Sequence, residues 1–254
     1  MTSIFDSPGF NQNLFFPRPD GLSVPYGSDE LLVEVEPGCR VHLRRYPSPD
    51  ARFSLLYFHG NGEIVSDYDS LASHFNALGS ELTVCDYRGY GRSEGTPTLR
   101  NGLEDAKVIY RHLRGNSKLK SKVCVMGRSL GSAPAIELCV QFPEIACCVI
   151  ESGYADPIPL VERRGLRIDK TTPAEDAMFS NSHKIRLIEC PLLIMHGEED
   201  FLIHSQEARL NYENAGSKHK ALEILEGVGH NDMMMACDNA YFESLTRFFK
   251  EIFI

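Results

Sequence analysis

The fold is decided by the stretch Lys122-Val123-Cys124-Val125-Met126-Gly127-Arg128-Ser129-Leu130-Gly131-Ser132-Ala133-Pro134-Ala135-Ile136. It begins with an apolar run typical of a strand, continues through a serine between two glycines, and ends in residues that favour a helix. A strand, a tight turn and a helix in this order form a nucleophile elbow, which presents a serine hydroxyl at the edge of a sheet. We therefore expect Ser129 to be a nucleophile.

The same five-residue pattern occurs a second time, at residues 91–95, and there it contains Ser93. This second match follows a glycine-punctuated loop instead of a strand. Gly95-Thr96-Pro97 comes after it, where an elbow would begin a helix. Because the pattern alone does not identify an elbow, its surroundings must decide. They favour Ser129 as the nucleophile and a structural role for Ser93.

Outside the elbow, nearly continuous apolar runs alternate with helical patterns. Such runs are typical of strands that are buried on both faces, and their alternation with helices predicts an α/β fold with a mostly parallel sheet and helices on both faces. We expect an antiparallel hairpin at residues 31–36 and 39–46, further strands at 53–58, 82–85, 123–126, 146–150, 192–195 and 221–225, and helices at 68–78, 99–113, 133–141, 205–215 and 239–253.

Two segments do not follow this alternation. Residues 1–28 are rich in Pro, Gly, Asn and Ser, and we expect an irregular N-terminal arm that Leu14-Phe15-Phe16 anchors to the rest of the chain. Residues 152–189 separate two strands and are too long for an ordinary connection, so we expect a short cap insertion beside the site. Residues 29–254 are predicted to form a single domain that includes this cap insertion.

Composition narrows the classes of partner. The chain has 254 residues and a net charge of −9, and an acidic chain is not expected to bind nucleic acid, which attracts a basic surface. No run approaches the roughly 20 apolar residues of a transmembrane segment. The N-terminus has neither a basic start nor a continuous apolar core, so we expect no signal peptide.

The eight cysteines are not arranged like a disulfide framework or a zinc site. Most lie in or beside apolar runs, where a free cysteine behaves as a small hydrophobic residue, and no C-x-x-C pair occurs. We expect reduced thiols in the core and a cytoplasmic location. We also expect no cofactor and no metal.

A serine hydroxyl needs a neighbouring base to take its proton. Of the nine histidines, His230 is the best candidate because it follows the last predicted strand and lies in the glycine-flanked segment 227–232; the alternative is a surface-loop histidine. His59 and His196 each end a strand and are expected to be structural.

The base in turn needs a carboxylate that fixes its tautomer. Asp200 is the best candidate, because the neighbouring apolar segment 201–203 would bury it, whereas Glu198 and Glu199 are expected to face solvent. The order Ser129, Asp200, His230 is also the chain order that accompanies an elbow of this type.

A tetrahedral intermediate needs two backbone N–H donors, the oxyanion hole. We expect one from Leu130, which follows the nucleophile, and one from Asn61, which lies between two glycines after the first buried strand; the alternative for Asn61 is a plain turn. Asp86 and Arg88 could suggest catalysis, but a role in pinning loops is favoured. The methionines at 233–235 are expected to begin the last helix and to lie mainly in the core.

Taken together, these segments resemble the α/β-hydrolase superfamily over nearly the whole chain, and more closely its Bem46-like branch, the ABHD17- and ABHD13-type serine hydrolases. The resemblance implies the α/β-hydrolase fold and a Ser–Asp–His triad. ABHD17-type proteins remove palmitate from cysteine thioesters and have a cysteine-rich N-terminus, whereas the first 38 residues here contain no cysteine. The motifs that carry the likeness are His59-Gly60-Asn61-Gly62, Asp86-Tyr87-Arg88-Gly89-Tyr90-Gly91, Gly127-Arg128-Ser129-Leu130-Gly131, His196-Gly197-Glu198-Glu199-Asp200 and Gly229-His230-Asn231-Asp232.

The sequence thus predicts a cofactor-free serine hydrolase that cleaves a carboxylic ester or thioester of a small-molecule or acylated substrate through an acyl-enzyme. A peptidase or C–C hydrolase could use the same triad, because the fold does not determine the reaction. A non-catalytic binding protein with a hydrolase fold is the alternative from another class. The acyl chain length and the oligomeric state stay open.

Overall fold

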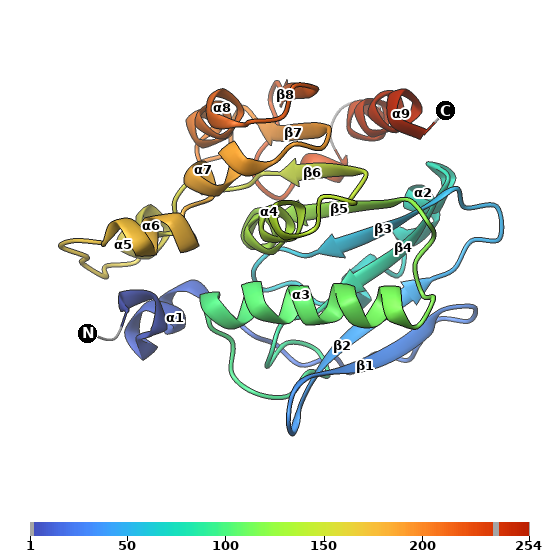
Figure 1. Cartoon of the computed structure of the whole chain (residues 1–254), viewed down its shortest axis with the longest axis horizontal. Helices are drawn as coiled ribbons and strands as arrows, with labels where there is room; N and C mark the ends of the chain where they lie inside the picture. The colour runs from blue at the N-terminus through green and yellow to red at the C-terminus, as the bar shows by residue number, and fades with distance from the viewer. Residues whose placement is uncertain (1–2, 236–238, 254) are drawn as a thin grey trace.

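The computed structural model describes residues 3–235 and 239–253. Within them, eight strands form one sheet in the order β1-β2-β4-β3-β5-β6-β7-β8 (Figure 1). The strands are β1 (Asp29–Glu36), β2 (Cys39–Tyr46), β3 (Phe53–Phe58), β4 (Ser80–Cys85), β5 (Val123–Arg128), β6 (Cys147–Glu151), β7 (Leu192–Gly197) and β8 (Lys220–Leu225).

The pairing confirms the predicted sheet. β1 pairs with β2 and β2 with β4 in antiparallel fashion, while β4, β3, β5, β6, β7 and β8 pair in parallel. The strands β3 to β7 are buried at every position, as expected where helices cover both faces of a sheet. β8 lies at the edge and is only partly buried.

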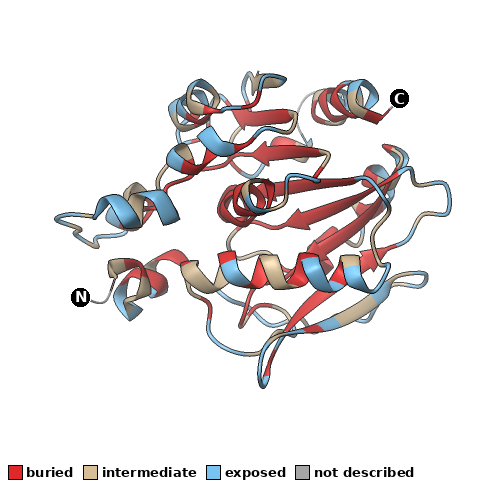
Figure 2. Cartoon of the chain, viewed as in Figure 1, coloured by how far each residue is buried: buried red, intermediate tan, exposed pale blue. Residues whose placement is uncertain are grey.

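Figure 2 shows the central strands as buried. Alternate residues of these strands belong to two different hydrophobic clusters, which therefore lie on opposite faces of the sheet. One contains residues of α1 (Pro8–Leu14), α3 (Leu99–Gly115), α4 (Ser132–Gln141) and α8 (Ser205–Asn214), and the other contains residues of α2 (Ala72–Ala77) and α9 (Ala240–Phe253). α9 turns one apolar stripe, which includes Tyr241, Leu245 and Phe249, towards the sheet, as an amphipathic helix does.

Two predicted elements differ from the structure. The predicted helix at 68–78 is a 3-10 turn η2 (Val65–Tyr68) followed by the shorter α2. The methionines form a separate 3-10 turn, η5 (Met233–Met235), before α9 begins, and only Met233 is fully buried.

Seven cysteines are free thiols, six of them buried; Cys237 lies outside the described residues.

The prediction of an irregular N-terminal arm is wrong in part. Residues 4–6 form the 3-10 turn η1 (Ile4–Asp6), and α1 follows because the Ser7 side chain accepts a hydrogen bond from Phe10 N–H and Pro8 occupies its first position. Phe10 and Leu14 are fully buried in the core, whereas Phe16 is 48% exposed. The arm therefore supplies core side chains, and its anchor extends well before residue 14.

The segment 152–189 forms three short helices and a 3-10 turn: α5 (Pro157–Glu162), α6 (Pro173–Phe179), α7 (Asn181–Lys184) and η4 (Ile185–Leu187). It lies beside α1 (Figure 1). Glu175 of α6 accepts hydrogen bonds from Ser3 Oγ and Ile4 N–H, and the ring centroids of Phe5 and Phe179 are 4.4 Å apart. The arm and this cap therefore pack against each other.

Across the two described ranges of the chain, no helix is both long enough and apolar enough to span a membrane.

Candidate active site

The predicted elbow lies where β5 ends, and its backbone requires the two glycines. Ser129 has a φ of 50°, a left-handed conformation that costs a non-glycine residue about 1–3 kcal/mol and is concentrated at functional sites. A Cβ on Gly127 would lie 2.1 Å from the carbonyl oxygen of Gly131, and one on Gly131 would lie 2.0 Å from that of Phe58. Only residues without a side chain allow the turn to be this tight.

The structure brings the three predicted residues of the triad together. His230 Nε2 lies 3.1 Å from Ser129 Oγ, and His230 Nδ1 lies 2.6 Å from Asp200 Oδ2. All three side chains belong to buried residues and follow the carboxyl ends of β5, β7 and β8. The site therefore lies at the edge of the sheet where ligands of open α/β proteins bind.

Asp200 is held as a carboxylate. Burial raises its pKa, but hydrogen bonds from His196 and His230, the positive charge of His230 when protonated, and the Ile203 N–H outweigh burial, so the pKa lies well below its usual range. An ionised Asp200 can only accept at Nδ1 of His230, so Nδ1 donates and Nε2 is left to accept the Ser129 hydroxyl proton.

The prediction that the segment 201–203 buries Asp200 is wrong in part. Ile203 is buried, but Phe201 is 81% exposed and Leu202 is 44% exposed. Asp200 is instead enclosed by polar contacts, because its Oδ1 accepts the N–H groups of Leu202 at 2.9 Å and Ile203 at 2.8 Å. Glu198 and Glu199 are exposed, as predicted.

The loops that hold the acid and the base are hydrogen-bonded to each other. The N–H of Glu199 donates to the Val228 carbonyl, and the N–H of Glu198 donates to the Leu225 carbonyl, both at 2.9 Å. A Cβ on Gly197 would lie 2.3 Å from the Val228 oxygen. The glycine thus lets the base loop approach β7, which sets the distance between Asp200 and His230.

Arg128, the residue before the nucleophile, joins three loops of the site. Its Nη2 donates to the His230 carbonyl at 2.9 Å and to Asn231 Oδ1 at 2.8 Å. Its Nη1 pairs with Glu63, whose other carboxylate oxygen accepts the Gly60 N–H at 2.7 Å. The side chain is 7% exposed, and its Nε lies 3.4 Å from Oε1 of Glu151, which is fully buried. Arg128 therefore links the elbow, the base loop and the loop that contains Asn61.

Sequence reasoning did not assign a role to Arg128 or Glu63. Arg128 could have been identified from its position next to an apolar strand, because an arginine that is buried there needs acidic partners. Burial lowers the Arg128 pKa, but the charges of Glu63 and Glu151 raise it further, so it lies above its usual value. Burial raises the pKa of Glu151 although Arg128 opposes that effect.

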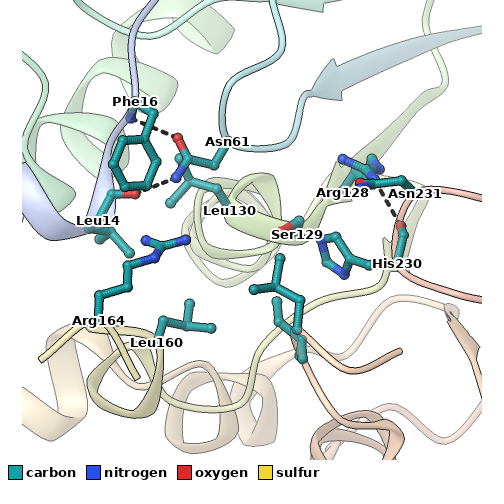
Figure 3. Close-up of a pocket in the computed structure, with 12 residues that line it drawn as sticks. Leu14, Phe16, Asn61, Arg128, Ser129, Leu130, Leu160, Arg164, His230 and Asn231 are labelled. Carbon is teal, nitrogen blue, oxygen red and sulfur yellow. Dashed lines mark hydrogen bonds between the residues drawn. The ribbon is translucent and has the colours of Figure 1, made fainter. Parts of the chain in front are cut away.

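The two residues predicted for the oxyanion hole, Asn61 and Leu130, line one pocket with Ser129 and His230 (Figure 3). The side chain of Asn61 has a second task. Its amide donates to the Leu14 carbonyl at 2.6 Å, and its oxygen accepts from Phe16 N–H at 2.9 Å. These two bonds fasten the end of the arm beside the pocket.

Ser93 and the buried histidines His42, His59 and His196 make structural contacts. Ser93 Oγ accepts the His42 N–H at 2.9 Å, which is the structural role predicted for it. His59 Nε2 lies 3.2 Å from Asp86 Oδ1, and His196 Nε2 lies 3.1 Å from Asp200 Oδ2. His196 therefore helps to hold the acid.

Asp86 and Arg88 pin loops, as predicted. Burial raises the pKa of Asp86, but hydrogen bonds from His42 and His59 bring it below its usual value. Asp86 also accepts the Val65 N–H at 3.0 Å. Arg88 forms two hydrogen bonds of 2.7 Å with the carboxylate of Asp105 in α3.

The N-terminal arm and the cap both contribute walls to the pocket beside Ser129. Leu14 and Phe16 come from the arm, Leu160 and Arg164 from the cap, and Leu202 and Ile203 from the segment after Asp200. Figure 3 shows His230 and Arg164 on opposite sides of Ser129. The sequence predicted that residues 152–189 lie beside the site but could not predict which residues face it.

Among the described residues, no group of three or more His, Cys, Asp or Glu side chains is arranged to hold a metal ion.

Comparison with known proteins gives relatives and a fold neighbour. Residues 49–158 and 155–234 match the family described as serine aminopeptidase, S33. The human α/β-hydrolase domain-containing protein 17B is 32% identical over 206 residues, which cover 79% of this chain and 67% of the relative. The α/β-hydrolase domain-containing protein aho-3 of Caenorhabditis elegans is 30% identical over 211 residues, which cover 80% of this chain and 59% of the relative. A solved esterase of Pyrococcus furiosus superposes with a TM-score of 0.78 at 17% identity, over 94% of this chain and all of the esterase chain.

Proposed function

The chain belongs to the α/β-hydrolase superfamily, in its Bem46-like branch, and from this premise we propose that it is a serine hydrolase that cleaves a carboxylic ester or thioester through an acyl-enzyme. The observation that carries the proposal is the chain of hydrogen bonds Ser129–His230–Asp200, at 3.1 and 2.6 Å. A non-catalytic relative would have no need of this geometry.

In the proposed reaction, Ser129 Oγ attacks the carbonyl carbon of the substrate while His230 Nε2 takes the hydroxyl proton. The N–H groups of Asn61 and Leu130 stabilise the resulting oxyanion. The intermediate collapses, the C–O or C–S bond breaks, and the leaving alcohol or thiol receives the proton from His230. Water, deprotonated by His230, then releases the acid and restores Ser129.

Asp200 has the role of orienting His230. Its low pKa keeps it ionised at neutral pH, so it stabilises the imidazolium that forms when His230 accepts the proton. Arg128 holds the backbone of the base loop through the carbonyl of His230. We further propose that the arm and residues 29–254 act as a single catalytic domain, with residues 152–189 as its cap.

The description of the matched family suggests an aminopeptidase reaction, but the charge of the pocket disfavours it. An aminopeptidase must bind a free α-ammonium group next to the scissile bond. The described residues that line the pocket include Arg164, which forms no ion pair with the described carboxylates, and no Asp or Glu, and a cation repels an ammonium group. Ester or thioester cleavage is therefore the proposal that the charge of the pocket favours.

The test compares Ser129→Ala with Ser93→Ala and wild type. We expect Ser129→Ala to abolish hydrolysis of a p-nitrophenyl ester of a short acid and labelling by a fluorophosphonate probe, while Ser93→Ala keeps both. Equal melting temperatures would show that both variants fold. Labelling that persists in Ser129→Ala but disappears in Ser93→Ala would overturn the proposal, as would a wild-type protein that neither hydrolyses nor reacts. Ester and thioester series of increasing acyl length would then define the substrate.

A further inference from the structure

The pocket beside Ser129 is small and has a charged far end. Its volume is about 170 Å³, below the roughly 300–1,000 Å³ of pockets that enclose drug-sized ligands. Leu14, Leu160 and Ile203 give it apolar walls, and Arg164 lies among them. Such a space suits a short acyl group better than a long one.

Arg164 is fixed by the arm. Its Cζ lies 4.7 Å from the ring centroid of Phe16, a distance typical of a cation–π contact, and its Nη1 donates to the Asn13 carbonyl. Figure 3 shows the guanidinium reaching over the pocket towards Leu130 and Asn61. Neither partner carries a charge, so the contacts set the position of the guanidinium without neutralising it.

Arg164 is the available cation of this pocket. The other arginine, Arg128, is already neutralised by Glu63 and Glu151. In the described part of the chain no carboxylate pairs with Arg164, since none of the ion pairs there includes it. Arg164 is an exposed residue, but partial burial of its guanidinium lowers its pKa, as happens when a cation loses water without gaining an anion.

The geometry also indicates which part of a substrate meets Arg164. His230 must protonate the leaving group, so the leaving group lies on the His230 side of Ser129. The oxyanion lies next to the N–H groups of Leu130 and Asn61. The remaining substituent of the carbonyl carbon is the acyl chain, and it must run away from His230. Arg164 and Leu160 lie in that direction (Figure 3).

We propose that the substrate's acyl group is short and ends in a carboxylate, so that the enzyme hydrolyses the half-ester or half-thioester of a dicarboxylic acid, with Arg164 as the counter-ion. This inference rests on the proposed function and names its substrate class. The remote carboxylate takes no part in the chemistry: the ester bond breaks, water supplies the new oxygen, and a dicarboxylate leaves together with the alcohol or thiol. A guanidinium binds a carboxylate through two parallel hydrogen bonds, which would also fix the depth of the acyl chain.

The experiment uses three p-nitrophenyl esters with the same six-carbon acyl chain: the adipate half-ester, which is anionic, the neutral hexanoate, and the cationic 6-aminohexanoate. We expect wild type to show a kcat/KM for adipate about tenfold above that for hexanoate, because a charge-assisted hydrogen bond at a partly exposed site contributes about that much. The value for 6-aminohexanoate should lie below that for hexanoate.

Two variants and a control assign the preference to one side chain. Arg164→Gln should bring the adipate-to-hexanoate ratio close to one, and Arg164→Glu should reverse the preference in favour of 6-aminohexanoate. Arg167 is exposed, as Arg164 is, but lies outside the pocket lining. Arg167→Gln therefore removes the same charge from the same loop, and it should keep the wild-type ratio.

Three results would overturn the proposal. Equal kcat/KM for adipate and hexanoate in wild type would show that the pocket does not select a carboxylate. If Arg164→Gln lowered kcat/KM by the same factor for all three esters, Arg164 would have a structural role only. In either case the hydrolysis of hexanoate would still support the proposed function. A wild type that hydrolyses none of the esters and resists the fluorophosphonate would instead remove the proposed function, and this inference with it.

Discussion

Replacing Arg128 with methionine should damage both the stability and the activity of the protein, for separate reasons. Methionine keeps much of the length of the side chain but removes the guanidinium. Glu63 and the fully buried Glu151 then lose their cation, and the base loop loses two hydrogen bonds, to the His230 carbonyl at 2.9 Å and to Asn231 at 2.8 Å.

The two effects have different magnitudes. Removing one partner of a buried ion pair costs about 3–5 kcal/mol, because the other charge is left unpaired. Glu151 limits this cost by taking up a proton, since burial already raises its pKa, and Tyr57 and Tyr241 still donate to its Oε2. For catalysis, loss of one charge-assisted hydrogen bond to the base loop is worth about 1.5–3 kcal/mol, which corresponds to a fall of roughly tenfold to a hundredfold in kcat/KM.

Urea unfolding and steady-state kinetics on a short p-nitrophenyl ester measure the two effects. The double variant Arg128→Met/Glu151→Gln should recover part of the lost stability but none of the activity, because it removes the unpaired acid without restoring the bonds to the base loop. Arg128→Lys keeps the charge without the planar fork and should fall between wild type and Arg128→Met in kcat. The reasoning is refuted if Arg128→Met unfolds within about 1 kcal/mol of wild type and keeps its kcat/KM within about threefold.

Two further predictions concern the elbow and the acid. Gly131→Ala places a methyl group 2.0 Å from a backbone oxygen and should lower the free energy of unfolding by more than about 3 kcal/mol. Gly102→Ala in α3, where a Cβ meets no heavy atom within 4 Å, should raise the free energy of unfolding by up to about 1 kcal/mol. Equal effects of the two substitutions in urea unfolding would contradict the steric argument. Because the folded pKa of Asp200 is depressed, its carboxylate stabilises the fold fully above its unfolded pKa of about 3.9, and this contribution is lost as the pH falls towards the folded value. The stability gap between wild type and Asp200→Asn should therefore be constant from pH 7 to about pH 5 and narrow below about pH 4, and a gap that widens on acidification would contradict the assignment.

The parts of the fold that sequence could predict are those that local pattern determines. Uninterrupted apolar runs marked the buried strands, because each of those strands is covered on both faces. The turn at Ser129 was recognisable from its two glycines. Backbone atoms come so close to Gly127 and Gly131 that no side chain fits at either position. The chain order of nucleophile, acid and base followed from the order of the strands that carry them.

The rest depended on contacts between distant segments. No local pattern reveals that Asn61 fastens Leu14 and Phe16, 47 and 45 residues away, and α1 was missed because a short helix in a Pro- and Gly-rich segment has little periodicity. Phe201 and Leu202 do not bury Asp200, contrary to the prediction, because two neighbouring N–H groups and two histidines enclose that carboxylate instead. The pocket walls lie in the arm and the cap, the two least patterned parts of the chain.

The central claim is that Ser129 is the residue that becomes acylated. Intact-mass analysis of the protein after reaction with a fluorophosphonate, followed by peptide mapping, tests it most directly. The account predicts one adduct per chain on the peptide that contains Ser129, and no adduct in Ser129→Ala. An adduct on Ser93, or an unmodified Ser129 in a protein that hydrolyses the ester, would contradict it.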